Sequence, residues 1–352
     1  MAARILSVGE AFPDHHYKQS ETLEALRRLW RDAGVDMGTV ERLHRNTLVK
    51  SRYLALPIDE YGPGKSWGDL NDIWIRLAED LGAKAALDAL GRAGLAPADV
   101  GTIVFVSVTG LSTPSIDARL VNRLGMPATT RRMPLFGLGC VAGAAGLACC
   151  ADLARAGPGP AIVLLSVELC SLTFQLDDIS TANIIATGLF GDGAAAVVLR
   201  GGGGDEDAHY PEIVDTRSIL YPGTEHVMGW DISERGFKLV LTPEIPTLIR
   251  EHLRRDVDRF LGENGLQRSD IAHWMAHTGG PKILTAMHEA LGLPEGALEV
   301  TWDRLRSVGN VSSASVLQIL MRTMEKRPER GSHGLMLAMG PGFCSELLLI
   351  RW

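Results

Sequence analysis

Cysteine is scarce in this chain, and no cysteines have the spacing of a metal site. Only five occur in 352 residues, and no C-x2-C pair is matched by a second such pair. A zinc site of that type is therefore excluded, and we expect no bound metal. The odd count also argues against a disulfide framework, so we expect reduced thiols and a cytoplasmic protein.

Long apolar runs are missing as well. No segment of about 18 consecutive apolar residues is present, so we expect no transmembrane segment. Residues 1–9 have the pattern of a short strand and lack the apolar core and cleavage site of a secretory signal. The net charge of -7 argues against nucleic acid as the main partner.

The chain does contain alternating strand-like and helix-like segments. We expect strands at 102–108, 161–167, 194–199, 271–276, 334–339 and 346–350, and helices at 71–93, 119–124, 245–264 and 281–291. Such alternation is typical of α/β proteins with helices layered on a sheet. The polar, glycine-rich segment 201–207 predicts a surface loop between two parts, 1–205 and 206–352.

Two short segments of the chain resemble each other. Residues 139–144 and 309–314 each place a reactive side chain, Cys140 or Asn310, in a turn of small residues before a helix of Ala, Ser and Gly. This similarity suggests two related halves. Such halves would bring two helix N-termini to one shared site.

Cys140 is the candidate nucleophile. It lies in the glycine-rich segment 137–146, where a strand, a sharp turn and a helix would place the sulfur near a helix N-terminus. The helix dipole and free N–H groups there favour the thiolate, which is the nucleophilic form. The alternative is a small buried cysteine on an Ala/Gly helix, and the local sequence leaves both readings open.

His277 and Asn310 are the other candidate catalytic residues. His277 precedes a Gly-Gly-Pro turn at the predicted end of a strand, and His273 would face the same side of that strand as the alternative. Asn310 either points into the site or caps a helix. A cysteine, histidine and asparagine spread along a fold in this order indicate acyl groups carried on sulfur.

Five motifs in this order resemble those of the type III polyketide synthases, the chalcone-synthase-like branch of the thiolase superfamily. They are residues 139–143, 189–195, 277–282, 309–314 and 340–343. The resemblance covers 4–352 and implies an α/β thiolase-like fold, in which two related βαβαβ halves form a five-layered αβαβα core. It also implies a homodimer that uses malonyl-CoA and acyl-CoA as substrates, without a permanently bound cofactor.

The resemblance also implies roles for single residues. Cys140 resembles the nucleophile that accepts the starter acyl group from coenzyme A, and His277 resembles the partner that keeps it a thiolate. His277 and Asn310 resemble the pair that hydrogen-bonds the thioester carbonyl of malonyl-CoA during loss of CO2, which would form an oxyanion hole. Phe190 resembles the aromatic gatekeeper between the CoA tunnel and the cavity.

Segment 168–174 is similar to that of bacterial alkylresorcinol and alkylpyrone synthases, which accept fatty acyl starters. In this resemblance Cys170 and Thr173 line the cavity, while Glu168 and Ser312 position a water beside the nucleophile. Leu239, where plant members have a bulky aromatic, favours a longer acyl pocket. Further cavity residues are expected in the turn of Gly340, Pro341 and Gly342.

Coenzyme A requires cations for its phosphates. The basic segment 42–52 matches the CoA-phosphate region of the family, with Lys50 and Arg52 as the main candidates and Arg45 behind them. Lys282, after the Gly-Gly turn, is a further candidate. The alternative for each is an ordinary solvated cation.

We therefore expect a type III polyketide synthase that loads a medium- or long-chain fatty acyl starter on Cys140. Extension with malonyl-CoA and ring closure would give products of alkylpyrone or alkylresorcinol type. One alternative is an enzyme like β-ketoacyl synthase III, which makes a single condensation but usually has His-Gln-Ala-Asn where this chain has His-Thr-Gly-Gly. The other is an inactive scaffold of the thiolase fold, which the intact Cys140, His277 and Asn310 argue against.

Overall fold

The computed structural model describes residues 1–31, 33–202 and 209–352. The expected boundary between residues 205 and 206 lies outside the described residues. The described strands are β1 (Ala2–Ala11), β2 (His15–Lys18), β3 (Ser51–Leu54), β4 (Val100–Val106), β5 (Arg131–Leu135), β6 (Ala161–Leu169), β7 (Asp192–Gly202), β8 (Glu212–Leu220), β9 (Met228–Ser233), β10 (Gly236–Leu241), β11 (Ile271–Ala276), β12 (His333–Gly340) and β13 (Cys344–Arg351).

The α-helices are α1 (Gln19–Leu29), α2 (Met37–Asn46), α3 (Trp67–Arg92), α4 (Ile116–Leu124), α5 (Ala142–Arg155), α6 (Thr181–Leu189), α7 (Ile245–Glu263), α8 (Pro281–Leu291), α9 (Glu299–Val308) and α10 (Ala314–Glu325). Short 3-10 turns that matter below are η1 (Ile58–Glu60), η3 (Gly139–Val141) and η4 (Cys170–Thr173). Within the described part of the chain, each helix is too short or too polar to cross a bilayer.

The main sheet has nine strands in the order β11-β12-β13-β8-β1-β7-β6-β4-β5. Only a short pairing of β1 with β8 joins its two parts. In the N-terminal part, β4 and β6 are parallel, and β6–β7 and β7–β1 are antiparallel. The C-terminal part repeats this pattern, because β11 and β12 are parallel while β12–β13 and β13–β8 are antiparallel. The two predicted halves therefore share one topology.

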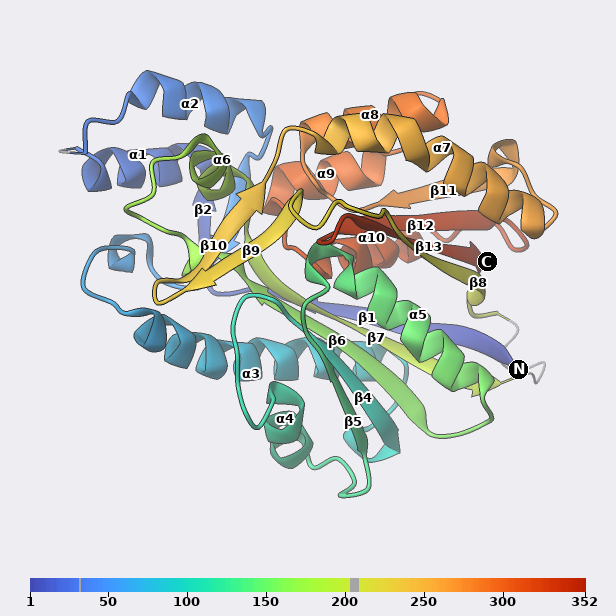
Figure 1. Ribbon diagram of the computed structural model, residues 1–352. Coiled ribbons are helices and arrows are strands. Elements are labelled where there is room, and N and C mark those ends of the chain that lie inside the picture. Colours follow the sequence, from blue (N-terminus) through green and yellow to red (C-terminus); the bar gives the residue numbers. More distant parts are fainter. Residues whose placement is uncertain (32, 203–208) are drawn as a thin grey trace.

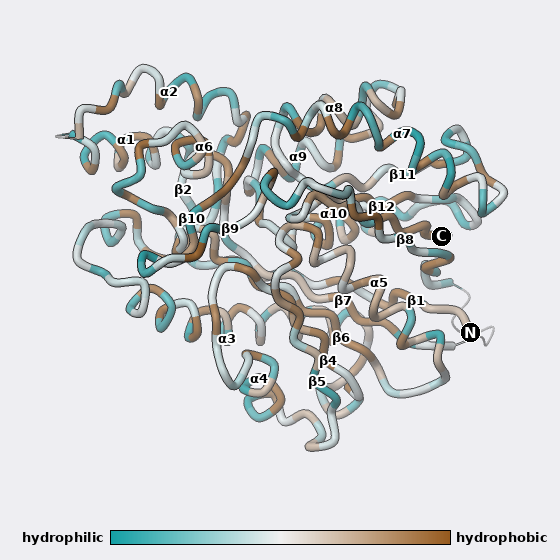
Figure 2. Tube along the Cα trace, in the orientation of Figure 1, coloured by the Kyte–Doolittle hydropathy of each residue, from teal (hydrophilic) through white to brown (hydrophobic). Residues whose placement is uncertain are grey.

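Helices and sheet parts stack in five layers (Figure 1). Helices α3 and α4 cover the outer face of the N-terminal part, α7 and α8 cover that of the C-terminal part, and α5 and α10 lie between them. Three apolar cores fill the interfaces, and Figure 2 shows the hydrophobic residues gathered along the strands of the sheet. The expected five-layered core is confirmed.

The sequences of β6 and α5 fit their buried positions. All nine residues of β6 are buried, because helices cover both faces of this strand, and its sequence is accordingly a nearly continuous apolar run. Helix α5 is built mainly of Ala and Gly, so it fits between the two sheet parts. A Cβ at Gly146 would lie 2.7 Å from Leu164 Cδ1 on β6, so no larger residue fits there without a shift.

A smaller group of elements lies to one side of the five layers (Figure 1). Helices α1, α2 and α6 pack on one another, and α6 also contacts the β9–β10 hairpin. This hairpin was not among the strands expected from the sequence. The bounds of β11 and α8 are as predicted, whereas β4 begins two residues earlier than expected and α4 begins at Ile116.

Candidate active site

Cys140 lies in η3, the turn that leads directly into α5. The preceding Gly139 has a φ of 56°, and a Cβ on it would lie 2.4 Å from Pro341 Cδ. A side chain at this position is therefore excluded by both the backbone conformation and the space. The predicted strand, sharp turn and helix around Cys140 are confirmed, with β5 as the strand.

A second glycine brings the two halves of the molecule together at the sulfur. A Cβ at Gly143 would lie 2.0 Å from the carbonyl oxygen of Ser313, so α5 can touch the start of α10 only without a side chain there. This approach places Cys140 Sγ 3.6 Å from Ser312 Oγ, within hydrogen-bonding distance for sulfur. Ser312 has a φ of 45°, an uncommon conformation for a residue other than glycine.

Asn310 is fixed by its backbone and by its side chain. Its N–H donates to Leu189 O and its carbonyl accepts from Gly191 N, both at 2.9 Å. Its side-chain Oδ1 accepts from the N–H of Ser312 at 2.8 Å. Since the amide oxygen is occupied, Nδ2 is the donor left for a ligand. The N-cap residue of α10 is Ser313, so Asn310 does not cap that helix.

His277 follows the last residue of β11 and is 3% exposed. Its backbone N–H donates to Leu337 O, while neither ring nitrogen has a hydrogen-bond partner among the described residues. Unpaired buried polar atoms are costly, so both nitrogens are available to a substrate. His273 is the edge partner of Trp352, with ring centroids 5.9 Å apart, and does not line the cavity described next.

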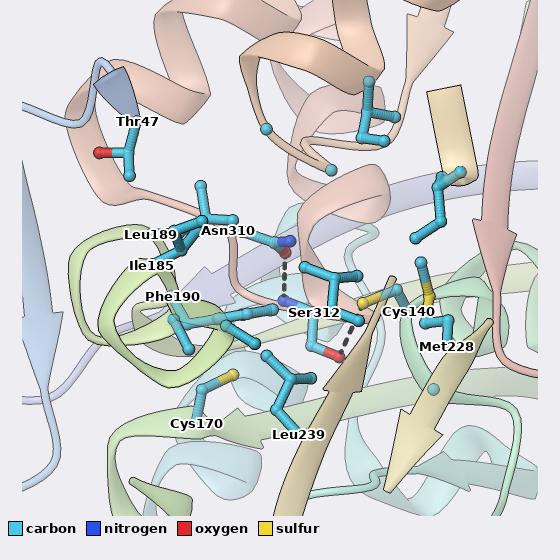
Figure 3. A pocket seen from close by; sticks show the side chains of 18 of the residues that line it. Thr47, Cys140, Cys170, Ile185, Leu189, Phe190, Met228, Leu239, Asn310 and Ser312 are labelled. Carbon is cyan, nitrogen blue, oxygen red and sulfur yellow. Dashed lines mark hydrogen bonds between the residues drawn. The ribbon is translucent and has the colours of Figure 1, made fainter. Parts of the chain in front are cut away.

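One cavity of about 540 Å³ joins these residues, since Cys140, His277 and Asn310 all line it. Figure 3 shows Cys140, Ser312 and Asn310 linked by hydrogen bonds, with Phe190, Cys170 and Leu239 beside them. Of the expected cavity residues, the structure places six on its wall: Phe190, Cys170, Thr173, Leu239, Ser312 and Pro341. The flanking Gly340 and Gly342 are not on the wall.

Burial sets the protonation of the two central groups. It raises the pKa of the Cys140 thiol to about 12, although the hydrogen bond with Ser312 acts in the opposite direction. It also lowers the pKa of His277 to about 4. Burial therefore opposes the thiolate that the helix start favours, and the thiolate at Cys140 stays a prediction.

Glu168 lies behind the cavity wall and not on it. Its carboxylate is fully buried and accepts hydrogen bonds from Thr109 Oγ1 at 3.0 Å, Val108 N at 3.2 Å and Ser313 Oγ. Burial raises its pKa to about 7. The expectation that Glu168 and Ser312 together hold a water beside the nucleophile stays a prediction, and the structure shows the Glu168 carboxylate hydrogen-bonded to Ser313, next to Ser312.

Arg52 is not available to coenzyme A. Its side chain is fully buried and donates to Phe190 O at 3.1 Å and to Gln19 Oε1 at 2.8 Å. The arginine instead holds the backbone of the candidate gatekeeper. Lys50 and Arg45 are exposed but do not line the cavity, whereas Lys282 is exposed and lines its mouth.

Several cavity residues were not predicted. Met228 and Trp230 on β9 and Leu241 on β10 line the cavity, and so does Phe174 after η4. The first three belong to an alternation at every second residue, the signal of a strand with one covered face. That signal was available in the sequence. Phe174 has no comparable signal, because it lies in an irregular segment.

Two similar α/β halves that close around a half-buried cysteine, a buried histidine and a buried asparagine define a thiolase-like acyltransferase. The chain matches the models for the N-terminal domain of chalcone and stilbene synthases over residues 1–203 and for the C-terminal domain over 212–352. It therefore belongs to the chalcone and stilbene synthase family, the type III polyketide synthases. This assignment replaces the two alternatives of a single-condensation synthase and an inactive scaffold.

Individual relatives agree with this assignment. The chain is 47% identical to a 1,3,6,8-tetrahydroxynaphthalene synthase of Streptomyces peucetius subsp. caesius over 99% of its length and 93% of the relative's. It is 37% identical to a putative chalcone synthase of Bacillus subtilis over 99% of both chains. The solved structure of the 1,3,6,8-tetrahydroxynaphthalene synthase of Streptomyces coelicolor superposes with a TM-score of 0.93 at 32% identity, over 99% of both chains.

Proposed function

We propose that this type III polyketide synthase builds its product from malonyl-CoA alone, as starter and as extender, and forms a product of tetrahydroxynaphthalene type. The support is the 47% identity over nearly the whole chain to a relative of that activity, together with a second such relative at 33%. A naphthalene skeleton can be assembled wholly from the two-carbon units that malonyl groups supply. No second substrate is then required.

Loading would begin at Cys140. His277 accepts the thiol proton while Sγ attacks the thioester carbonyl of the acyl-CoA, and the C–S bond to coenzyme A breaks. The coenzyme A thiolate then takes the proton from His277, which leaves a neutral imidazole and an acyl group on Cys140. Burial lowers the pKa of His277, so the ring is neutral and can accept a proton, but the same shift makes it a weaker base.

Extension would use the same donors a second time. Asn310 Nδ2 and an N–H of His277 donate to the thioester oxygen of malonyl-CoA, and loss of CO2 leaves an enolate at that oxygen. Such preorganised donors lower the barrier because they bind the oxygen most strongly when its charge is greatest. The enolate carbon attacks the Cys140 thioester, the C–S bond to Cys140 breaks, and the extended chain leaves on coenzyme A while Cys140 is released as a thiolate. Repeated loading would lengthen it.

We place the phosphates of coenzyme A near Lys282, since this exposed cation borders the mouth of the cavity. Lys50 and Arg45 lie further from the mouth and would act on the phosphates only through their charge. No permanently bound cofactor is needed for these steps. The cysteine, the histidine and the amide supply all the required groups.

A fatty acyl starter, with an alkylpyrone or alkylresorcinol product, is the second candidate. It is favoured by the apolar wall of the cavity, where Leu239 stands in place of an aromatic and Ile185, Leu189 and Met228 lie nearby. Such a wall suits an alkyl chain. The two candidates differ in the starter and in the product, so one experiment separates them.

The experiment is product mass spectrometry with purified protein. Malonyl-CoA is supplied alone or with acyl-CoA starters from acetyl to stearoyl, and Cys140→Ala runs in parallel. A tetrahydroxynaphthalene from malonyl-CoA alone supports the proposal. Products that appear only with a fatty acyl-CoA support the second candidate, and the absence of both product and acyl adduct overturns the two.

The oligomeric state of the protein and its cellular compartment are further proposals. We expect a homodimer, on the resemblance to the family, and a cytoplasmic protein, on the free cysteines. Sedimentation equilibrium of the purified protein tests the first. A monomer that retains activity would contradict it.

A further inference from the structure

The turn η4 forms part of the wall of the catalytic cavity. Cys170 and Thr173 at its two ends line the cavity, whereas Ser171 between them does not and is only 2% exposed. Thr173 Oγ1 donates to Cys170 O at 2.7 Å, which closes the turn on itself. The loading and extension steps above assign no role to Ser171.

Ser171 binds a single carboxylate with both of its donors. Its backbone N–H donates to Asp192 Oδ1 at 2.8 Å, and its hydroxyl donates to Asp192 Oδ2. Asp192 is fully buried, and its Oδ2 also accepts from Ala55 N at 2.6 Å. We call the two bonds from Ser171 the Ser171–Asp192 clamp. Since they reach both oxygens of one carboxylate, they fix the position of η4 and also its rotation.

The neighbours of Ser171 fix the direction of its hydroxyl. Two backbone N–H groups already point at the Asp192 carboxylate, so the carboxylate is the acceptor and the serine donates. The hydroxyl of Tyr61 pairs with Ser171 Oγ and must then be the donor of that bond, and it accepts from Leu56 N at 3.1 Å. The clamp therefore stays complete without Tyr61.

The clamp connects η4 to the segment that carries Phe190. Asp192 is the first residue of β7 and lies two residues after Phe190, which also lines the cavity. Figure 3 shows the side chains of Cys170 and Phe190 on this part of the wall. Arg52 donates to Phe190 O at 3.1 Å, and its charge interacts with that of Asp192. The carboxylate of Asp192 thus holds η4 in place relative to Phe190.

We propose that Ser171 is a positioning residue for chain extension, and that its clamp on Asp192 keeps η4 in the position that the growing chain requires. A chain that is extended repeatedly fills more of the cavity at each step, so the late intermediates contact the wall most closely. A displaced wall would slow extension and release short chains early, while Cys140 would still be loaded. This inference rests on the proposed function, because repeated extension must take place in this cavity.

The test compares loading with extension. Wild type and Ser171→Ala are incubated with malonyl-CoA, the acyl adduct on Cys140 is quantified by mass spectrometry, and the products are separated by chain length. We expect the same adduct level in both proteins. The yield of full-length product per adduct should fall by at least about tenfold in the variant, with shorter released chains in its place.

Alkylation of Cys170 gives a second measurement that does not depend on activity. It is followed with iodoacetamide and peptide mass spectrometry in Cys140→Ala and in Cys140→Ala/Ser171→Ala, so that the nucleophile does not compete. Cys170 is buried in η4. We expect its alkylation to be several-fold faster in the double variant, because local opening of the turn exposes the thiol.

Ser345→Ala is the matched control. Ser345 is also a buried serine, and its hydroxyl pairs at 3.1 Å with Tyr221, which donates to Asp256 at 3.0 Å. None of these three residues lines the cavity. We expect Ser345→Ala to lose a similar amount of stability in urea denaturation as Ser171→Ala, but to form the products of the wild type.

Tyr61→Phe is the second control, because it removes a partner of Ser171 and leaves the clamp complete. It should also form the products of the wild type. Unchanged products and unchanged Cys170 alkylation on Ser171→Ala substitution overturn the inference, and so does an equal change in either control. If the wild type forms neither adduct nor product, the proposed function fails, whereas the rate of Cys170 alkylation still decides whether the clamp holds η4.

Discussion

Phe190 and Asn310 come from opposite halves of the molecule, yet their backbones pair as an isolated parallel bridge. Two hydrogen bonds of 2.9 Å, Gly191 N to Asn310 O and Asn310 N to Leu189 O, make this bridge. A Cβ at Gly309 would lie 2.7 Å from Leu189 O, so glycine is required beside it. The aromatic ring at the cavity wall and the amide inside the cavity are thereby fixed relative to each other.

Asn310→Ala should separate loading from extension. The amide Nδ2 is placed to stabilise the enolate, whereas attack by Cys140 on a thioester does not require it. We expect the rate of malonyl-CoA decarboxylation to fall by about 10²–10³-fold, the usual cost of one oxyanion donor. The acyl adduct on Cys140 should still form. If the variant loses both the adduct and the decarboxylation activity, Asn310 acts on the fold or on the nucleophile instead.

Ser312→Ala should make Cys140 less reactive. The serine hydrogen bond lowers the pKa of a thiol that burial raises, so its removal raises that pKa further. A higher pKa means a smaller thiolate fraction at any pH below it, and each pKa unit reduces that fraction about tenfold. The rate of alkylation of Cys140 by iodoacetamide, followed by peptide mass spectrometry against pH, should shift toward higher pH.

Thr173→Val is the matched control for this measurement. Its hydroxyl also lies on the cavity wall but donates to Cys170 O at 2.7 Å, away from the nucleophile. We expect its alkylation profile to match that of the wild type. A Ser312→Ala profile that also overlays the wild type would contradict the assigned hydrogen bond.

Arg52→Leu should destabilise the fold. The guanidinium is fully buried near the buried carboxylate of Asp192, and it lowers the pKa of that carboxyl against the effect of burial. Removal of the guanidinium leaves the carbonyl of Phe190 and Gln19 Oε1 without this donor, so we expect a loss of roughly 1–3 kcal/mol in unfolding free energy, measured by urea denaturation. The exposed Lys50→Ala should change it by less than about 0.5 kcal/mol. An Arg52→Leu variant of normal stability but weak CoA binding would instead support the expectation from the sequence that Arg52 binds the phosphates of coenzyme A.

Lys282→Ala should weaken the binding of malonyl-CoA without slowing the chemistry. The lysine is exposed at the cavity mouth, so its contribution to a phosphate contact is modest, about 1 kcal/mol. We expect KM to rise several-fold with kcat unchanged, which is the signature of binding energy shared by ground and transition states. Arg45→Ala, away from the cavity, is the comparison. Equal effects of both variants would indicate a general electrostatic field and no specific contact.

The sequence was sufficient for the features that depend on short-range chemistry. The glycines around Cys140 and Asn310 predicted the two turns, and the order of motifs predicted the layers and the three candidate residues. It was insufficient where segments that are far apart in the sequence determine the surroundings of a side chain. Arg52 looks like a surface cation in its basic segment, yet β3 carries it into the interior, where the carbonyl of Phe190 accepts its hydrogen bond.

The burial that affects the pKa of Cys140 could not be predicted from the sequence either. A helix N-terminus can be recognised in the sequence, but the burial that raises the thiol pKa results from the packing of α5 against α10 and the Pro341 turn. The sequence also gives no sign that the carboxylate of Glu168 accepts a hydrogen bond from Ser313, the residue next to Ser312.

The most direct test of the central claim is isotope labelling of the product. Uniformly carbon-13-labelled malonyl-CoA is supplied together with unlabelled acyl-CoAs, and the product of the wild type is compared with that of Cys140→Ala. Malonyl priming predicts a product labelled at every carbon, which is absent from the Cys140→Ala reaction. A product that contains an unlabelled acyl group, or one that persists without the cysteine, would contradict the account.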